Sequence, residues 1–206
     1  ENLENKQLLS LAKSDLSQAI QSKPELHWVS ANLGVLEWQN GNPEAAKLYL
    51  ITAQKAAPQE PSYPLNLGVI YEELGQPELA AQMYVSSLNI APYTSSHPFW
   101  QMTGLREMAL QTWQVENLKS VANEPAPYWQ LAISSLETDL HQASKYAALS
   151  RWTNELPLAS LTAEWKVLHA LGDDAGELEV LEEVFQEMRQ PVLSIGRVYS
   201  ATYSQI

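Results

Sequence analysis

The chain repeats itself after 34 residues, and a repeat of that length leaves few possible folds. Shifted by 34 positions, residues 31–58 (ANLGVLEWQNGNPEAAKLYLITAQKAAP) align without gaps on residues 65–92 (LNLGVIYEELGQPELAAQMYVSSLNIAP). Prolines then continue the spacing at intervals of 33, 32 and 34 residues, at Pro92, Pro125, Pro157 and Pro191. A single unit of this size cannot bury its apolar face alone, so neighbouring units must stack on one another.

Each repeat carries the signals of two helices joined by a tight turn. Gly41 is placed to end the first helix, because glycine adopts the left-handed conformation that terminates helices. Pro43 then occupies the first turn of the second helix, where its missing amide hydrogen costs nothing, and Asn42 is the expected cap. Gly75 and Pro77 repeat this arrangement 34 residues later. The sequence therefore predicts pairs of antiparallel helices.

Small residues mark the place where the two helices of each pair approach most closely. Gly34 and Ala46 hold the eighth and twentieth places of the first full unit, and Gly68 and Ala80 hold them in the second. A larger side chain there would cost about 1–3 kcal/mol. A 34-residue unit with these small residues and a closing proline resembles the tetratricopeptide repeat, a helix-turn-helix module. Glu37 departs from the family pattern, which has an aromatic residue at that place.

The resemblance implies an all-α, right-handed superhelical solenoid of helix-turn-helix repeats, with about twelve helices in a single body over residues 1–206. Its expected parts are a half-unit (1–24), five full units (25–58, 59–92, 93–125, 126–157 and 158–191) and a terminal helix (192–206). Within the last three units we expect helices near residues 98–109, 127–139, 141–154, 158–171 and 175–189. Gly172 is the predicted terminator between the last two, with Asp173 or Asp174 as the following cap.

The unit at residues 93–125 and the two ends of the chain fit the pattern least well. Trp113 falls at the twentieth place of that unit, so we expect splayed helices or one longer helix there. The first half-unit lacks its partner helix, and residues 192–206 carry an apolar stripe that includes Ile195 and Tyr203. We therefore expect a segment of a larger protein, with terminal helices that cap the array as the alternative.

Composition and motifs argue against an enzyme, a metal site and a cofactor site. The chain has 24 acidic and 12 basic residues, a net charge of −12, so its field repels nucleic acid and anionic lipid. It has no cysteine, and its four histidines have no metal-binding spacing. His169 near Asp173 and Asp174 is interpreted as a surface histidine. No apolar run is long enough to span a membrane, and the compartment stays unknown, cytoplasmic or extracytoplasmic.

In the resembling family, the first helix of each unit lines a concave groove that holds the partner. The positions that match here are Trp28, Ala31, Asn32, Val35, Trp38, Gln39, Leu65, Asn66, Val69, Glu72 and Glu73. The family's carboxylate clamp needs lysine and asparagine where this chain has alanine, leucine and valine, so a clamp for a partner's terminal carboxylate is not expected.

These residues predict a scaffold that binds a protein or peptide, either basic or apolar. Asn32 and Asn66 could pair with the backbone of an extended peptide, although asparagine is also common at this place for structural reasons. Trp28 and Trp38 are candidate anchors. The acidic pair Glu72 and Glu73 would favour a basic partner.

Two other functions remain open. The first alternative is a docking or regulatory appendage of a larger membrane protein, since the repeats resemble tails attached to bacterial surface-polysaccharide polymerases and ligases. The second alternative is a glycan-binding module, because exposed aromatic rings stack on sugars. Packing between repeats is the simpler interpretation for most of the aromatic residues, namely Trp100, Trp113, Trp129, Trp152 and Trp165.

Overall fold

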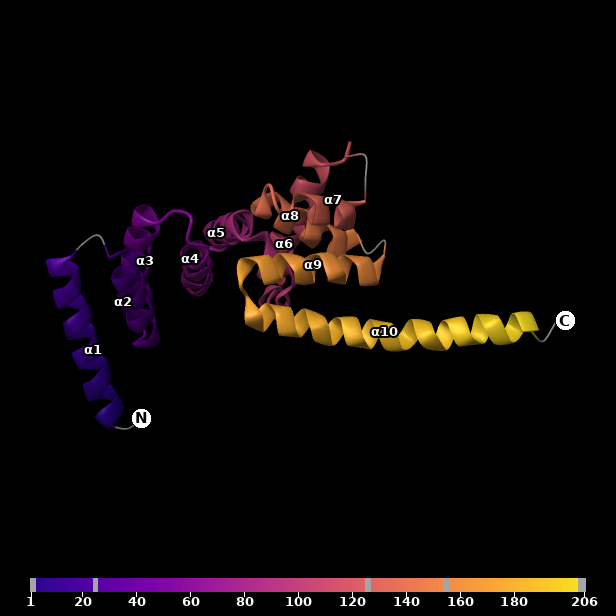
Figure 1. Cartoon of the computed structure of the whole chain (residues 1–206). Coiled ribbons are helices and arrows are strands. Elements are labelled where there is room, and N and C mark those ends of the chain that lie inside the picture. Colours follow the sequence, from indigo (N-terminus) through magenta and orange to yellow (C-terminus); the bar gives the residue numbers. More distant parts are fainter. Residues whose placement is uncertain (1–2, 24–25, 125–126, 154–155, 204–206) are drawn as a thin grey trace. The chain divides into compact units, whose positions relative to one another are not determined.

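The computed structural model describes residues 3–23, 26–124, 127–153 and 156–203, without the side chains of residues 3–6, 9 and 189–203. The described part of the chain forms ten α-helices and two short 3₁₀ helices and contains no strand (Figure 1). The prediction of an all-helical repeat fold is confirmed, but the predicted number of twelve helices is wrong. The expected unit boundaries at residues 24–25 and 125–126 lie outside the described residues.

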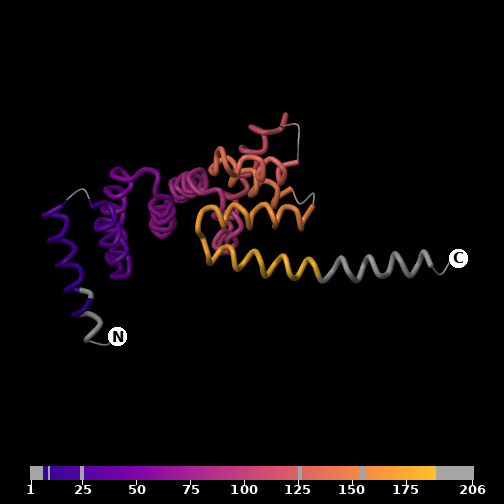
Figure 2. Tube along the Cα trace, in the orientation of Figure 1, coloured from indigo at the N-terminus to yellow at the C-terminus, as the bar shows by residue number. Residues whose placement is uncertain are grey.

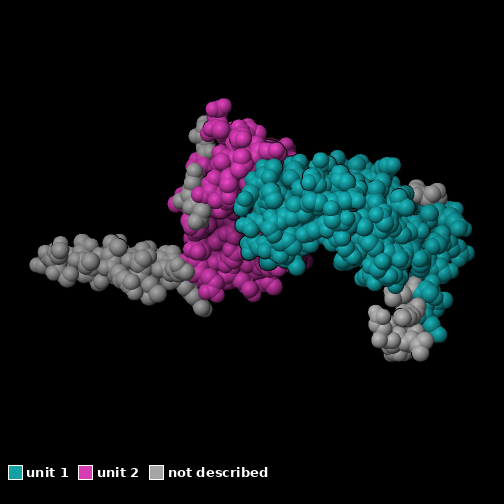
Figure 3. Space-filling view, turned by 180° about the vertical axis from the view of Figure 1, so that it is seen from behind, with its two compact units in different colours: residues 1–90, 98–113 teal, residues 91–97, 114–206 magenta. Residues whose placement is uncertain are grey.

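Two compact units can be recognised (Figure 3), and each is described by itself. Unit 1 comprises residues 1–90 and 98–113, and unit 2 comprises residues 91–97 and 114–206. Unit 1 contains α1 (Leu3–Ser22), α2 (His27–Gln39), α3 (Pro43–Ala56), α4 (Ser62–Glu73), α5 (Pro77–Ile90), η2 (Pro98–Gln101) and the first part of α6 (Gly104–Ser120). Unit 2 contains η1 (Pro92–Ser96), the rest of α6, α7 (Tyr128–Ser135), α8 (Leu140–Thr153), α9 (Pro157–Leu171) and α10 (Asp174–Tyr203).

The turns between paired helices form as the sequence predicts. Gly41 and Gly75 have φ values of 76° and 68°, in the left-handed region, and α3 and α5 begin at the prolines that follow. Figure 2 shows the chain reversing direction at these turns within unit 1. Asn42 occupies the cap position of α3, but its side chain makes no capping bond and donates instead to Glu37 Oε2 at 3.0 Å.

The small residues lie where the paired helices meet. A Cβ atom added to Gly34 would lie 2.8 Å from Leu50 Cγ and 3.1 Å from the Ala46 carbonyl oxygen. Ala46 and Leu50 are fully buried, and they belong to the core that joins α2, α3 and α4. The close approach predicted at these positions is therefore confirmed, and it sets the distance between α2, which carries part of the candidate site, and α3.

The helix expected to start near Pro98 is replaced by 3₁₀ turns. Proline has no amide hydrogen, so Pro92 and Pro98 interrupt the i to i−4 hydrogen bonds of an α-helix. His97 is extended, with φ −64° and ψ 137°, as a residue before proline must be. The α-helix begins only at Gly104 and buries Trp113, which is 1% exposed.

In unit 2 the predicted helices form, with one difference at the end. Gly172 terminates α9 with φ 72°, and Asp173 Oδ1 accepts a hydrogen bond from the Gly176 amide at 3.1 Å, which confirms the predicted stop and cap. The predicted break at Pro191 is wrong, because α10 continues from Asp174 to Tyr203. The apolar stripe expected at residues 192–206 lies outside the residues whose side chains are described.

The tryptophans expected to pack between repeats differ in their burial. Trp100 and Trp113 are buried as predicted, but Trp152 is 39% exposed and does not pack as expected between repeats. Over the helices described here, none is both long enough and apolar enough to cross a membrane.

Candidate functional site

The predicted groove residues lie on α2 and α4, the first helices of two successive repeats. The two helices are joined at both ends. At their starts, His27 Nδ1 lies 2.6 Å from the Tyr63 hydroxyl oxygen, and at their ends the Trp38 indole donates to Glu73 Oε2. Since start meets start and end meets end, α2 and α4 run side by side in the same direction. Both helices belong to unit 1.

Two tryptophans of α2 are exposed to solvent. Trp28 is 49% exposed and Trp38 is 37% exposed. They are ten positions apart along α2, which corresponds to about 15 Å along a helix. The hydrogen bond from the Trp38 indole to Glu73 holds that ring in place. Helix α2 therefore carries one exposed ring fixed by a hydrogen bond near its end and a second exposed ring near its start.

The two asparagines lie at equivalent positions of the neighbouring helices. Asn32 is exposed and Asn66 is half-buried. Within the described part of the chain, neither side-chain amide takes part in a hydrogen bond. Both amides therefore keep their donors and their acceptor available, which is the property that pairing with a peptide backbone requires.

The remaining groove residues divide between surface and core. Val35, Leu65 and Val69 are half-buried, while Gln39 is exposed. Ala31 is only 7% exposed and belongs to the core cluster, so it supports the surface from below.

The Glu72 carboxylate is hydrogen-bonded to other side chains of the protein, whereas the sequence suggested a carboxylate free to meet a partner. It accepts hydrogen bonds from the Tyr84 hydroxyl (2.6 Å), the Thr103 hydroxyl (2.8 Å) and Arg106 Nε (2.9 Å). Burial raises the pKa of Glu72, but the three hydrogen bonds and the charge of Arg106 outweigh it, so that the pKa lies below the ordinary value of 4.5. Of the predicted acidic pair, only Glu73 remains exposed.

Sequence reasoning missed Thr103 and Arg106, which form the other half of this network. The guanidinium carbon of Arg106 also lies 4.2 Å from the centre of the Phe99 ring. A signal for the pair is present in the sequence, since Arg106 follows Glu72 by 34 residues, one full repeat. It was hidden because the repeat that contains Arg106 lacks the usual glycine and proline turn.

Glu37, the departure from the family pattern, forms a second ion pair inside unit 1. Its side chain is almost completely buried and pairs with Lys13 of α1. The hydrogen bond from Lys13 lowers the pKa of Glu37, and this effect exceeds the opposing effect of burial. The polar residue at this place thus ties α1 to α2.

The residues considered for catalysis or metal binding do not assemble into such a site. His169 Nδ1 lies 3.3 Å from Glu177 Oε2 on an exposed face, away from the pairing with Asp173 or Asp174 that was considered. A search of the described residues finds no group of three or more histidine or carboxylate side chains that could hold a metal ion.

Comparison with known protein families finds a repeat at the same positions at which the sequence repeats itself. The family model for the tetratricopeptide repeat matches residues 29–60 and 65–94, which cover most of α2 and α3 and most of α4 and α5. A search of curated proteins gives no match. Tetratricopeptide repeats generally mediate protein–protein interaction, and their proteins are typically non-enzymatic scaffolds. Over residues 29–60 and 65–94, the chain is similar to the tetratricopeptide repeat family.

Proposed function

We propose that the α2–α4 surface binds an extended peptide segment of another protein. This surface is defined by residues of both helices, namely Trp28, Asn32, Val35, Trp38, Gln39, Leu65, Asn66, Val69 and Glu73. One observation carries the proposal: Asn32 and Asn66 sit at equivalent positions of two parallel helices, and neither amide is used within the described protein.

An asparagine amide can donate to a peptide carbonyl and accept from a peptide N–H without regard to the peptide's side chains. Two such amides, one on each helix, would hold a backbone across the surface. A hydrogen bond contributes about 0.5–1.5 kcal/mol net, so two asparagines give only modest affinity. The larger share would come from the partner's apolar side chains against Val35, Leu65 and Val69.

Trp28 and Trp38 would supply the anchors of the interface. Tryptophan is enriched among the residues that dominate binding energy, because it buries a large rigid area. The charge that the partner meets is smaller than the sequence suggested, since Arg106 already neutralises Glu72 and Glu73 receives a hydrogen bond from Trp38. The surface therefore favours an apolar peptide, with at most a mild preference for a basic one.

Peptide selection followed by mutation tests the proposal. Peptides are selected from a random display library against the full chain, and their dissociation constants are measured by fluorescence polarisation. The double substitution Asn32→Ala and Asn66→Ala is expected to weaken binding about tenfold, from the loss of roughly 0.7 kcal/mol at each amide.

Gln82→Ala provides the matched control, because Gln82 is an exposed amide on α5 outside the surface. It should leave binding unchanged. Selected peptides whose affinity survives the double asparagine substitution but falls with substitutions elsewhere would contradict the proposed site.

A further inference from the structure

Unit 2 contains two adjoining clefts that share part of their walls. An apolar cleft of about 550 Å³ lies between α7 and the start of α9, and an acidic cleft of about 440 Å³ lies against α10. Pro157 and Glu187 line both clefts. The two clefts therefore adjoin each other, and together we call them the α9–α10 trough.

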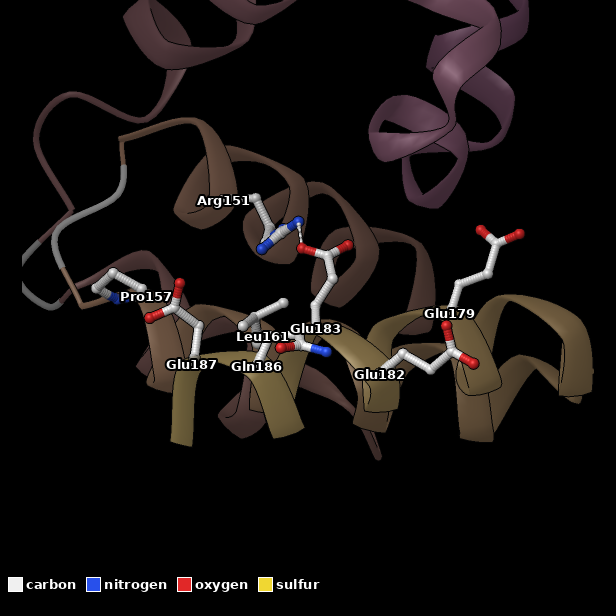
Figure 4. Close-up of a pocket in the computed structure, with 8 residues that line it drawn as sticks. All are labelled: Arg151, Pro157, Leu161, Glu179, Glu182, Glu183, Gln186 and Glu187. Atoms are coloured by element: carbon white, nitrogen blue, oxygen red, sulfur yellow. Dashed lines mark hydrogen bonds and ion pairs between the residues drawn. The ribbon is translucent and has the colours of Figure 1, made fainter. Parts of the chain in front are cut away.

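The acidic half of the trough is made by one face of α10. Glu179, Glu182, Glu183 and Glu187 line it, at helical spacings that place them together. Figure 4 shows Glu183 directed toward Arg151, with Glu187 beside Pro157.

Most of this negative charge is uncompensated. Arg151 is the basic residue of the acidic cleft, and it pairs with Glu183 at 2.7 Å and with the buried Glu164 at 2.8 Å. Among the side chains that the structure describes, none forms an ion pair with Glu179, Glu182 or Glu187. A cation that entered this half of the trough would therefore meet three carboxylates without having to displace an existing partner.

The other half of the trough is apolar and partly open to solvent. Leu156 is 54% exposed and Leu158 is 41% exposed, beside Ile133 and Trp129 in the wall. The Trp129 indole nitrogen is buried and has no hydrogen-bond partner in the described part of the protein. An unmet buried donor is unfavourable.

We propose that the α9–α10 trough binds a protein segment in which apolar side chains are followed by lysine or arginine. The apolar residues of such a segment would cover Leu156 and Leu158, and its basic residues would reach Glu182 and Glu187. A purely apolar ligand would leave the carboxylates unused, and a purely basic ligand would leave the apolar half uncovered. The site is separate from the α2–α4 surface and adds a second partner class to the proposed function.

The test uses a fluorescein-labelled synthetic peptide with a run of leucines followed by a run of lysines. Binding to the full chain is measured by fluorescence anisotropy at low and at ordinary salt. Because the whole chain carries a charge of −12, any cationic peptide is attracted to some extent, so local and general attraction must be separated.

Two charge-matched variants separate them. Glu182→Gln with Glu187→Gln removes two carboxylates of the trough, whereas Glu116→Gln with Glu137→Gln removes two exposed carboxylates that do not line it. The trough variant is expected to bind about fivefold more weakly, from two exposed ion pairs, and the control to change binding less than about twofold. Equal weakening by both variants would overturn the proposal.

The apolar half has its own matched pair. Leu158→Ser should weaken the peptide about threefold or more, whereas Leu48→Ser, at a leucine of α3 that is 65% exposed, should have no effect. Circular dichroism spectra of all variants establish that they remain folded. The proposal fails if the peptide shows no saturable binding at millimolar concentration, or if replacing its leucines with alanine leaves the affinity unchanged.

Discussion

Replacing Gly68 with alanine tests the helix packing that positions the α2–α4 surface. A Cβ atom at this position would lie 3.0 Å from Tyr84 Cζ and closer still to two other carbons of the ring. The Tyr84 ring cannot easily move aside. It is fully buried, its hydroxyl donates to Glu72, and it meets Trp100 edge to face at 5.9 Å between ring centres.

The expected magnitude follows from two opposing effects. Alanine is favoured over glycine within a helix by about 1 kcal/mol. Forcing an extra methyl group into a packed core costs about 1–3 kcal/mol, and the rigid surroundings of Tyr84 place Gly68 at the upper end of that range. We therefore expect Gly68→Ala to lower the free energy of unfolding by about 2 kcal/mol. Gly34→Ala should lower it less, because Leu50 is a flexible neighbour at 2.8 Å.

Urea unfolding followed by circular dichroism and tryptophan fluorescence measures the change. With a slope of about 2 kcal/mol per molar urea, the midpoint of the unit 1 transition should fall by about 1 M. Gly104→Ala is the control, since no heavy atom lies within 4 Å of the added Cβ there. In a Tyr84→Leu background, Gly68→Ala should cost much less, because the clashing ring is gone. The packing argument is refuted if Gly68→Ala and Gly104→Ala unfold at the same urea concentration.

Three further predictions concern the ion pairs of unit 1. Arg106→Ala removes the charge that balances the partly buried Glu72 and should destabilise unit 1 by about 2–3 kcal/mol in urea unfolding. Because the folded pKa of Glu72 is lowered, the stability it contributes is present above its ordinary value of 4.5 and is lost as the pH falls through the lowered pKa. Acid unfolding curves of wild type and Arg106→Ala should converge there. Lys13→Ala leaves Glu37 buried without its cation and should increase amide exchange in α1.

The helices and turns of the first two repeats could be predicted because their signals are local. Gly41 and Gly75 need only their own backbone conformation to end a helix, and the prolines that follow need only a free first turn. The close contact at Gly34 was also predictable, since the repeat places a small residue there twice. Such features depend on a few neighbouring residues, so they can be predicted without knowledge of the rest of the fold.

The incorrect predictions concern residues for which local sequence rules allow more than one structure. Pro98 was expected to begin an α-helix, which proline favours, but it begins a 3₁₀ turn, which proline also permits. Trp152 was expected to pack between repeats, yet it is 39% exposed on α8. Whether an apolar residue is covered depends on which helix packs against it, and that is decided by tertiary contacts.

The repeat period carried more information about the site than the prediction used. In a stack of equivalent units, residues one period apart lie on adjacent equivalent helices and are candidates for contact. The hydrogen bonds that join α2 to α4 span 35 and 36 residues, and the pair Glu72 and Arg106 spans 34. Trp38, Glu72 and Arg106 are successive positions of one 34-residue series, although Arg106 stands in a unit without the usual turn. The start of α6 therefore occupies the place of a first helix in the third repeat. Because Arg106 at this start pairs with Glu72, Glu72 stabilises the fold instead of facing a partner as predicted.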